Sequence, residues 1–159
     1  MSDLRELAEN FAKHTECKLD MLDNGYGCTI SLGQIELRIM HQPGSEILVF
    51  QLPVGILPEN PEQKLSCLIR LMTSNDLFKD TKGLTLGYNE EANLVTLQNA
   101  WELNTLDQEK FSELVFRLLN EEIVWMKKLE ANELESTLSQ NSDQTLTEDN
   151  LKNTQWLSL

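Results

Sequence analysis

The side chains best suited to chemistry in this chain are its two histidines and three cysteines. His14 and Cys17 are three positions apart, which would let both reach one metal ion, but the chain holds only one further histidine, His41. No Cys-x-x-Cys or His-x-x-x-His pair accompanies them. A thiol near a histidine can also act as a nucleophile, yet no oxyanion turn or orienting acid is recognisable around Cys17. We therefore expect neither a metal site nor a catalytic residue.

Two other kinds of candidate residue are better explained as ordinary structure. Gly25, Gly27 and Gly33 do not form a phosphate-binding loop, because they lead into a strand pattern and no lysine follows them. The acid pairs at 90–91 and 121–122 fall in a turn and on a helix flank, where we expect them to be solvated. The sequence predicts a binding protein without a cofactor rather than an enzyme.

The composition limits the class of protein further. A chain of 159 residues suits one domain, and thirteen basic against twenty-six acidic residues give a net charge of -13, which repels nucleic acids and anionic membranes. No apolar run approaches the roughly 18 residues of a membrane span. Acids near the start argue against a signal peptide, and three irregularly spaced cysteines suit a reducing compartment. We expect a cytoplasmic protein that neither binds nucleic acid nor inserts into membranes.

The first half of the chain reads as a helix followed by three strands. Asp3 is a helix-capping residue, and apolar residues at helical spacing extend to Thr15. Alternating apolar and polar residues predict strands over 28–32 and 35–40, with a turn between them. The third strand, over 46–57, is apolar on both faces, so we expect it at the centre of the sheet or covered on both sides.

The second half reads as a helix, two strands and a long helix. Asn60 begins the first helix, strands follow over 84–88 and 95–103, and a capping box of Thr105 and Gln108 precedes the last helix. This order predicts one α+β domain of residues 1–130, with three helices on one side of a twisted antiparallel sheet of about five strands. Residues 131–159 are polar, and we expect a flexible tail.

The helix over 60–77 carries apolar residues on two sides. Leu65, Ile69 and Met72 share one stripe with Leu68, whereas Cys67 and Leu71 point almost the opposite way. One side suits the chain's own core, and the other can be covered by a second copy, which predicts a homodimer. The alternative is a helix covered by its own loops. The predicted interface combines this helix with the strand that follows, through Cys67, Leu71, Leu84 and Leu86.

Two adjoining segments carry a resemblance to a known family. Residues 83–103, GLTLGYNEEANLVTLQNAWEL, lead into residues 106–119, LDQEKFSELVFRLL. Together with the element order and the acidic composition, they resemble the class I type III secretion chaperones, the family of the Tir chaperone CesT. The likeness covers residues 1–129 and lies in layout and apolar spacing. The polar tail is longer than the family pattern, so nothing is carried over to it.

The resemblance implies a homodimeric chaperone of the bacterial cytoplasm with no ATPase of its own. Such a chaperone binds the N-terminal segment of one or a few secreted effectors, keeps that segment extended and secretion-competent, and presents it to the export apparatus. The secretion ATPase is a further partner that the resemblance suggests. The alternative function is an adaptor or regulator of the secretion system that binds a partner already folded. The two differ in whether the bound segment is disordered when it is free.

An extended client segment can add to a sheet edge while its alternate side chains enter apolar pockets. We expect the first helix and the first three strands to line such a groove, and the alternative for each of these positions is ordinary core. The candidate groove residues are Leu7, Phe11, Ile30, Ile35, Leu37, Ile39, Leu48 and Phe50.

Overall fold

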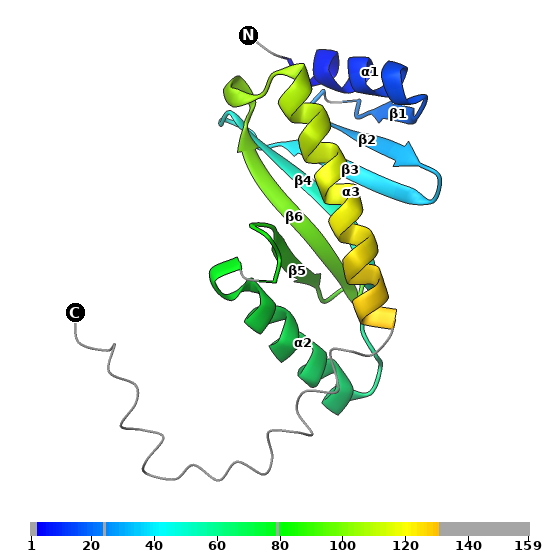
Figure 1. Ribbon diagram of the computed structural model, residues 1–159, viewed down its shortest axis with the longest axis vertical. Helices are drawn as coiled ribbons and strands as arrows, with labels where there is room; N and C mark the ends of the chain where they lie inside the picture. The colour runs from blue at the N-terminus through cyan, green and yellow to red at the C-terminus, as the bar shows by residue number, and fades with distance from the viewer. Residues whose placement is uncertain (1–2, 24, 79, 131–159) are drawn as a thin grey trace, which may run out of the picture.

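The computed structural model describes residues 3–23, 25–78 and 80–130, so the predicted flexible tail of residues 131–159 lies outside the described part. Its helices and strands run in the order shown in Figure 1. They are α1 (Leu4–Thr15), β1 (Lys18–Met21), β2 (Gly27–Leu32), β3 (Ile35–His41), β4 (Ile47–Ile56), α2 (Pro61–Asn75), η1 (Asp76–Phe78), β5 (Thr85–Asn89), β6 (Leu94–Glu102), η2 (Leu103–Thr105) and α3 (Gln108–Glu130), where η marks a short 3-10 helix.

The strands form one antiparallel sheet of six strands in the order β1-β2-β3-β4-β6-β5. The predicted α+β domain is confirmed, but the sheet has one strand more than the expected five. The additional strand is β1, which pairs with β2 and places Lys18 opposite Ser31. Its four residues alternate between charged and apolar side chains, and a pattern of that length is too short to predict a strand.

The centre of the sheet is β4, which lies between β3 and β6 as its apolar sequence predicts. Its alternate residues Leu48, Phe50 and Leu52 are buried on the side of the core. The pairing with β6 shifts between Pro53 and Gly55, so the proline lies at a bulge, where its missing N–H is tolerated.

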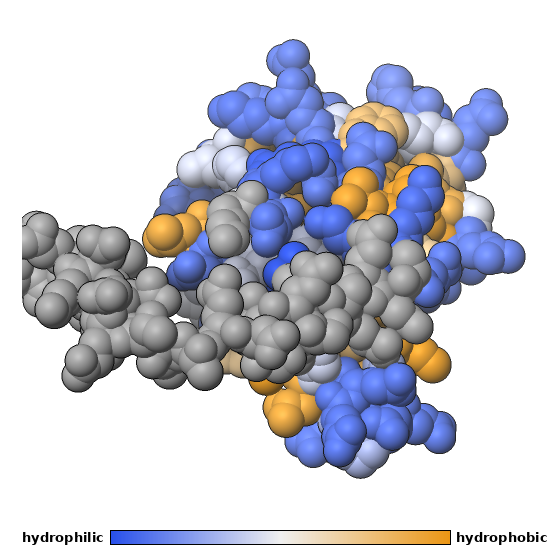
Figure 2. Space-filling view, turned by 60° about the horizontal axis from the view of Figure 1, so that its bottom comes forward, coloured by the Kyte–Doolittle hydropathy of each residue, from blue (hydrophilic) through white to orange (hydrophobic). Residues whose placement is uncertain are grey.

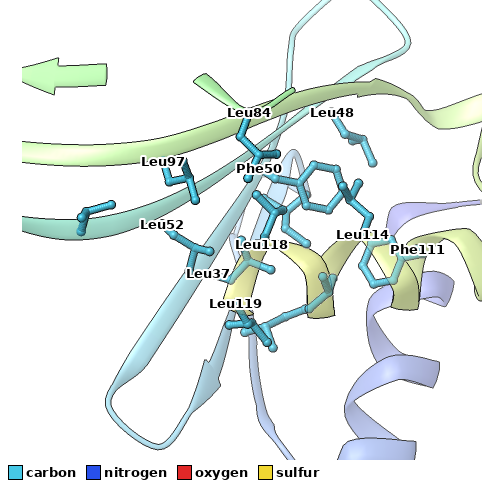
Figure 3. Packing of buried hydrophobic residues seen from close by; sticks show 14 of the residues in the cluster. Leu37, Leu48, Phe50, Leu52, Leu84, Leu97, Phe111, Leu114, Leu118 and Leu119 are labelled. Atoms are coloured by element: carbon cyan, nitrogen blue, oxygen red, sulfur yellow. The ribbon is translucent and has the colours of Figure 1, made fainter. Parts of the chain in front are cut away.

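The core is closed by α3, which runs along the sheet and packs on β4, with α1 beside its first turns (Figure 1). Three phenylalanines join these elements. The ring of Phe111 on α3 lies 5.9 Å from that of Phe50 on β4 and 6.0 Å from that of Phe11 on α1, centre to centre. Figure 3 shows Phe50 and Phe111 together with leucines of the sheet and of α3 in the core.

The helix starts are fixed by side-chain caps, two of which the sequence predicts correctly. Asp3 accepts a hydrogen bond from the N–H of Arg5 at 3.2 Å, and Asn60 caps α2. The predicted capping box of Thr105 with Gln108 is wrong. Thr105 belongs to η2, so α3 begins later and Asp107 accepts from the backbone N–H at position 110 at 2.9 Å.

Candidate functional site

A hollow of about 540 Å³ lies between the end of α1 and the start of α3. Two aromatic rings form its apolar part: Phe11 from α1 and Phe116 from α3, whose centres lie 5.5 Å apart. Phe11 is buried, whereas 47% of Phe116 is exposed. The other lining residues are His14, Thr15, Gln108, Glu109 and Ser112. The hollow therefore offers aromatic surface within a polar border.

Gln108 gives this hollow an unmet hydrogen-bond acceptor. Its side-chain amide nitrogen donates to the carbonyl oxygen of Leu7 at 3.3 Å, which ties the first turn of α3 to α1. The other amide atom, Oε1, is buried and has no hydrogen-bond partner among the described residues. Because an unpaired buried acceptor costs free energy, a ligand that brings an N–H to this oxygen would be favoured.

The apolar surface continues along the outer side of α3. Ile123 lies two turns after Phe116 on the same side of the helix, and 43% of its surface is exposed. Val124 is also exposed but faces a different side of the same helix. The chain thus leaves two large apolar side chains, Phe116 and Ile123, exposed on one side of α3, and the first of them lies in the hollow. Large apolar side chains left uncovered in a row are typical of interaction surfaces.

An unpaired strand edge lies on the same half of the molecule. β1 is the first strand of the sheet, and among the described residues its outer edge has no strand partner. Its side chains Lys18 and Asp20 are exposed and form an ion pair at 2.8 Å. Such an edge presents backbone N–H and C=O groups that can pair with an added strand.

The predicted groove residues lie mostly in the core. Seven of the eight are buried within the chain, and only Ile35 on β3 is half-buried. At these seven positions the structure therefore agrees with the alternative, which is ordinary core. Phe11 differs from the other six because its ring also lines the hollow between α1 and α3. The buried set is Leu7, Phe11, Ile30, Leu37, Ile39, Leu48 and Phe50.

The two sides of α2 are reversed relative to the prediction. The predicted interface residues Cys67, Leu71, Leu84 and Leu86 are all buried within the single chain, and Figure 3 places Leu84 in the core cluster. The structure therefore places these four side chains in the core of the single chain, and their role as contact residues between subunits stays a prediction.

The opposite stripe of α2 is the one left exposed. Leu65, Ile69 and Met72 lie along one side of the helix, with 73% of Met72 exposed. Figure 2, in which this end of the molecule comes forward, shows hydrophobic patches between hydrophilic side chains. The helix therefore does carry apolar residues on two sides, as the sequence predicts, and the uncovered side is the Leu65 side.

The acid pair on α3 is not solvated as predicted. Glu121 is nearly buried and forms an ion pair with Lys82 at 2.5 Å, while Glu122 is only 2% exposed. Desolvation raises the pKa of the Glu122 carboxyl to about 7. Its Oε2 has no partner among the described residues. The other pair, Glu90 and Glu91, lies exposed in the turn before β6, as expected.

The histidines and cysteines are held in local contacts. A ring nitrogen of His14 lies 2.6 Å from the Asn10 carbonyl oxygen, and the Thr15 hydroxyl donates to the Cys17 sulfur at 3.3 Å. Burial raises the pKa of the Cys28 thiol to about 12, which disfavours the reactive thiolate. Among the described residues no three metal-ligating side chains come together, and none of the described helices is long and apolar enough to cross a membrane.

Solved structures share this fold at low sequence identity. The HopA1–SchA chaperone–effector complex matches with 16% identity, a TM-score of 0.56 and coverage of 80% of this chain and 92% of the other. The ExsC–ExsE complex matches with 18% identity, a TM-score of 0.57 and coverage of 80% of this chain and 97% of the other. The ExoU–SpcU complex from the type III secretion system of Pseudomonas aeruginosa matches with 16% identity, a TM-score of 0.56 and coverage of 78% of this chain and 98% of the other. No curated protein matches the chain in sequence.

The fold is thus that of the type III secretion chaperones, a class of binding proteins without enzymatic activity. Within this class, the chain belongs to the Tir chaperone protein (CesT) family, which it matches over residues 6–126. The resemblance drawn from the sequence is confirmed. The match ends four residues before the end of α3, so the tail is outside it.

Proposed function

We propose that this type III secretion chaperone binds the N-terminal segment of a secreted effector in the cytoplasm and keeps it extended until it is presented to the export apparatus. The observation that carries the proposal is the hollow between α1 and α3, with Phe116 exposed in it and Ile123 exposed on the same side of α3. The effector complexes of relatives with the same fold support it. In this proposal the chaperone domain is residues 1–130, and residues 131–159 lie outside it.

The energetics require a long contact. Each client side chain that is fully buried contributes on the order of 1.5 to 3 kcal/mol, while ordering the client backbone costs about 1 to 2 kcal/mol per residue. One pocket is therefore too little. The hollow, the exposed Ile123 of α3, the half-buried Ile35 and the free edge of β1 together offer a surface long enough for several client side chains.

A homodimer doubles this surface. The exposed α2 stripe of Leu65, Ile69 and Met72 is the region we assign to the contact with the second copy, in place of the side first predicted. Packing the stripe against its own symmetry mate would remove a row of large apolar side chains from water, which is the driving force for a two-fold interface. The secretion ATPase remains a further partner in this proposal.

The test is limited proteolysis of the chain co-purified with an effector of its own bacterium. An N-terminal effector fragment should resist digestion in the complex, and the same fragment alone should give the poorly dispersed NMR amide signals of a disordered chain. A bound fragment that is already folded when free would instead support the adaptor function. A complex in which no effector segment is protected would contradict both.

A further inference from the structure

We propose that residues 152–159 of the chain itself occupy the hollow between α1 and α3, so that the tail competes with whatever else binds there. The inference adds an internal occupant to the proposed client surface. Its test uses no client, so it can fail while the proposed function stands, and the reverse also holds.

The chemistry of the hollow matches that of the segment. The aromatic pair Phe11 and Phe116 needs an apolar partner, and Oε1 of Gln108 needs a hydrogen-bond donor. The segment, KNTQWLSL, supplies Trp156 and Leu157 as apolar groups, and its amide and indole N–H groups as donors. An indole combines both properties in one side chain.

Charge distinguishes this segment from the rest of the tail. Residues 152–159 hold one lysine and no acidic side chain, and the one carboxylate among the lining residues of the hollow is Glu109. The attraction between Lys152 and that carboxylate favours the segment. The preceding part of the tail is acidic and would be repelled, because it contains Glu133, Glu135, Asp143, Glu148 and Asp149.

The length of the connecting chain suits the distance. From Glu130, where α3 ends, back to the α3 residues that line the hollow, Phe116 to Gln108, the helix rises about 21 to 33 Å, at about 1.5 Å per residue. A random coil as long as residues 131–151 has a root-mean-square end-to-end distance of about 25 Å, and fully extended it reaches about 70 Å. An intramolecular site is favoured most when these two lengths agree.

The match of lengths sets the size of the expected effect. A connecting chain of suitable length holds the segment at an effective concentration on the order of 1 mM near the hollow. If the same segment binds the hollow as a free peptide with a Kd of about 0.1 mM, it would be mostly bound when it is attached to the chain. A competitor for the hollow would then bind the wild-type chain about tenfold more weakly than a chain whose tail cannot dock.

The test measures binding of a fluorescent peptide of residues 150–159 to the full-length chain by anisotropy. We compare the wild type with the triple variant Trp156→Ala, Leu157→Ala, Leu159→Ala. The matched control is Leu138→Ala, Leu146→Ala, which removes apolar groups from the tail outside the segment. The peptide should bind the triple variant about tenfold more tightly than either the wild type or the control.

A second variant places the binding in the hollow. Phe116→Ser, added to the triple variant, should abolish peptide binding, and because Phe116 is exposed the fold should persist by circular dichroism. Equal affinity of the peptide for the wild type and the triple variant would overturn the proposal. So would peptide binding that survives Phe116→Ser. If the difference in peptide affinity between the wild type and the triple variant vanishes when the protein is diluted, the tail comes from a neighbouring chain. That result would also contradict the proposal, in which the tail binds to its own chain.

Discussion

The side chain of Asn75, at the end of α2, makes two hydrogen bonds with the backbone of Leu86 in β5. Its Nδ2 donates to the Leu86 carbonyl oxygen at 2.9 Å, and its Oδ1 accepts from the Leu86 N–H at 2.9 Å. β5 is the last strand of the sheet, so this amide occupies the edge where another strand would pair. Asn75 lies one turn after the buried Leu71, so the contact joins the core-facing side of α2 to β5.

Asn75→Asp should destabilise the chain. A carboxylate can accept from the Leu86 N–H but cannot donate to its carbonyl oxygen, which would be left without a donor next to a negative charge. We expect the free energy of unfolding to fall by about 1 to 3 kcal/mol, measured by urea denaturation. Asn99→Asp is the control, because the Asn99 amide makes only an exposed bond of 3.3 Å to Gly83. Equal losses in the two variants would contradict the role of Asn75.

Ile69→Glu should convert the proposed homodimer into a monomer. The change places a charge in the middle of the exposed α2 stripe, where a second copy would have to bury it without a partner. Sedimentation velocity at micromolar concentration measures the outcome. Ile123→Glu introduces the same charge on α3 and should leave the dimer intact. If Ile69→Glu still sediments as a dimer, the interface lies elsewhere.

Phe116→Glu should weaken client binding. The variant removes the exposed aromatic wall of the hollow, and a client side chain that packs there loses about 1.5 to 3 kcal/mol, which is about a 10- to 150-fold rise in Kd. Isothermal titration with an effector fragment gives the value. Val124→Glu adds the same charge to another side of α3 and should change the Kd little. Similar effects of both variants would point to charge repulsion instead of the hollow.

Glu122 should make stability depend on pH. Burial raises the pKa of its carboxyl in the folded chain from 4.5 to about 7, so the folded state binds the proton more tightly than the unfolded state does. Its contribution is fully present below pH 4.5 and is lost as the pH rises through 7. The loss amounts to at most about 3 kcal/mol.

Glu122→Gln should remove that part of the pH dependence. The amide is uncharged at every pH, so the variant should be more stable than the wild type at pH 8 and similar to it at pH 4, measured by urea denaturation. Glu90→Gln removes an exposed charge from the turn before β6 and should leave the profile of the wild type. A Glu122→Gln profile parallel to that of the wild type would rule out this assignment.

Gly27→Ala should destabilise the sheet more than Gly55→Ala. A Cβ at position 27 would lie 2.6 Å from the carbonyl oxygen of Ile39, which belongs to the paired strand and cannot move freely. At position 55 it would meet the end of the Leu129 side chain, which can rotate away. We expect a loss of about 1 to 3 kcal/mol for Gly27→Ala and less for Gly55→Ala, by thermal and urea denaturation. The reverse order would contradict the assigned contacts.

Most of the fold follows from periodicity and capping. The switch from helical to alternating spacing, and the caps at Asp3 and Asn60, place α1, α2 and the longer strands close to their observed bounds. The strand β1 is missed because four residues carry too little pattern. The start of α3 is missed because a 3-10 turn precedes it, and Thr105 and Asp107 are both good capping residues.

The site is harder to predict because burial depends on tertiary contacts. The sequence indicates two apolar sides of α2, but which one is covered depends on where β5 lies, and Asn75 joins the covered side to Leu86 of that strand. Spacing does contain a signal for Glu122, which falls four residues after the buried Leu118 on the same side of α3. Phe116 carries no such signal, since it borders the buried stripe and becomes notable only once α1 lies beside it.

The two ends of the sheet are not equivalent, because a side-chain amide bonds to the edge of β5 while the edge of β1 has no strand partner among the described residues. Polymers that grow strand by strand need both ends free, so that every subunit can accept one neighbour and offer itself to the next. On the β5 side the Asn75 amide already uses the backbone N–H and C=O of Leu86, which disfavours such growth. In the proposed function, the open backbone edge available to a client would then be the β1 edge and not the β5 edge.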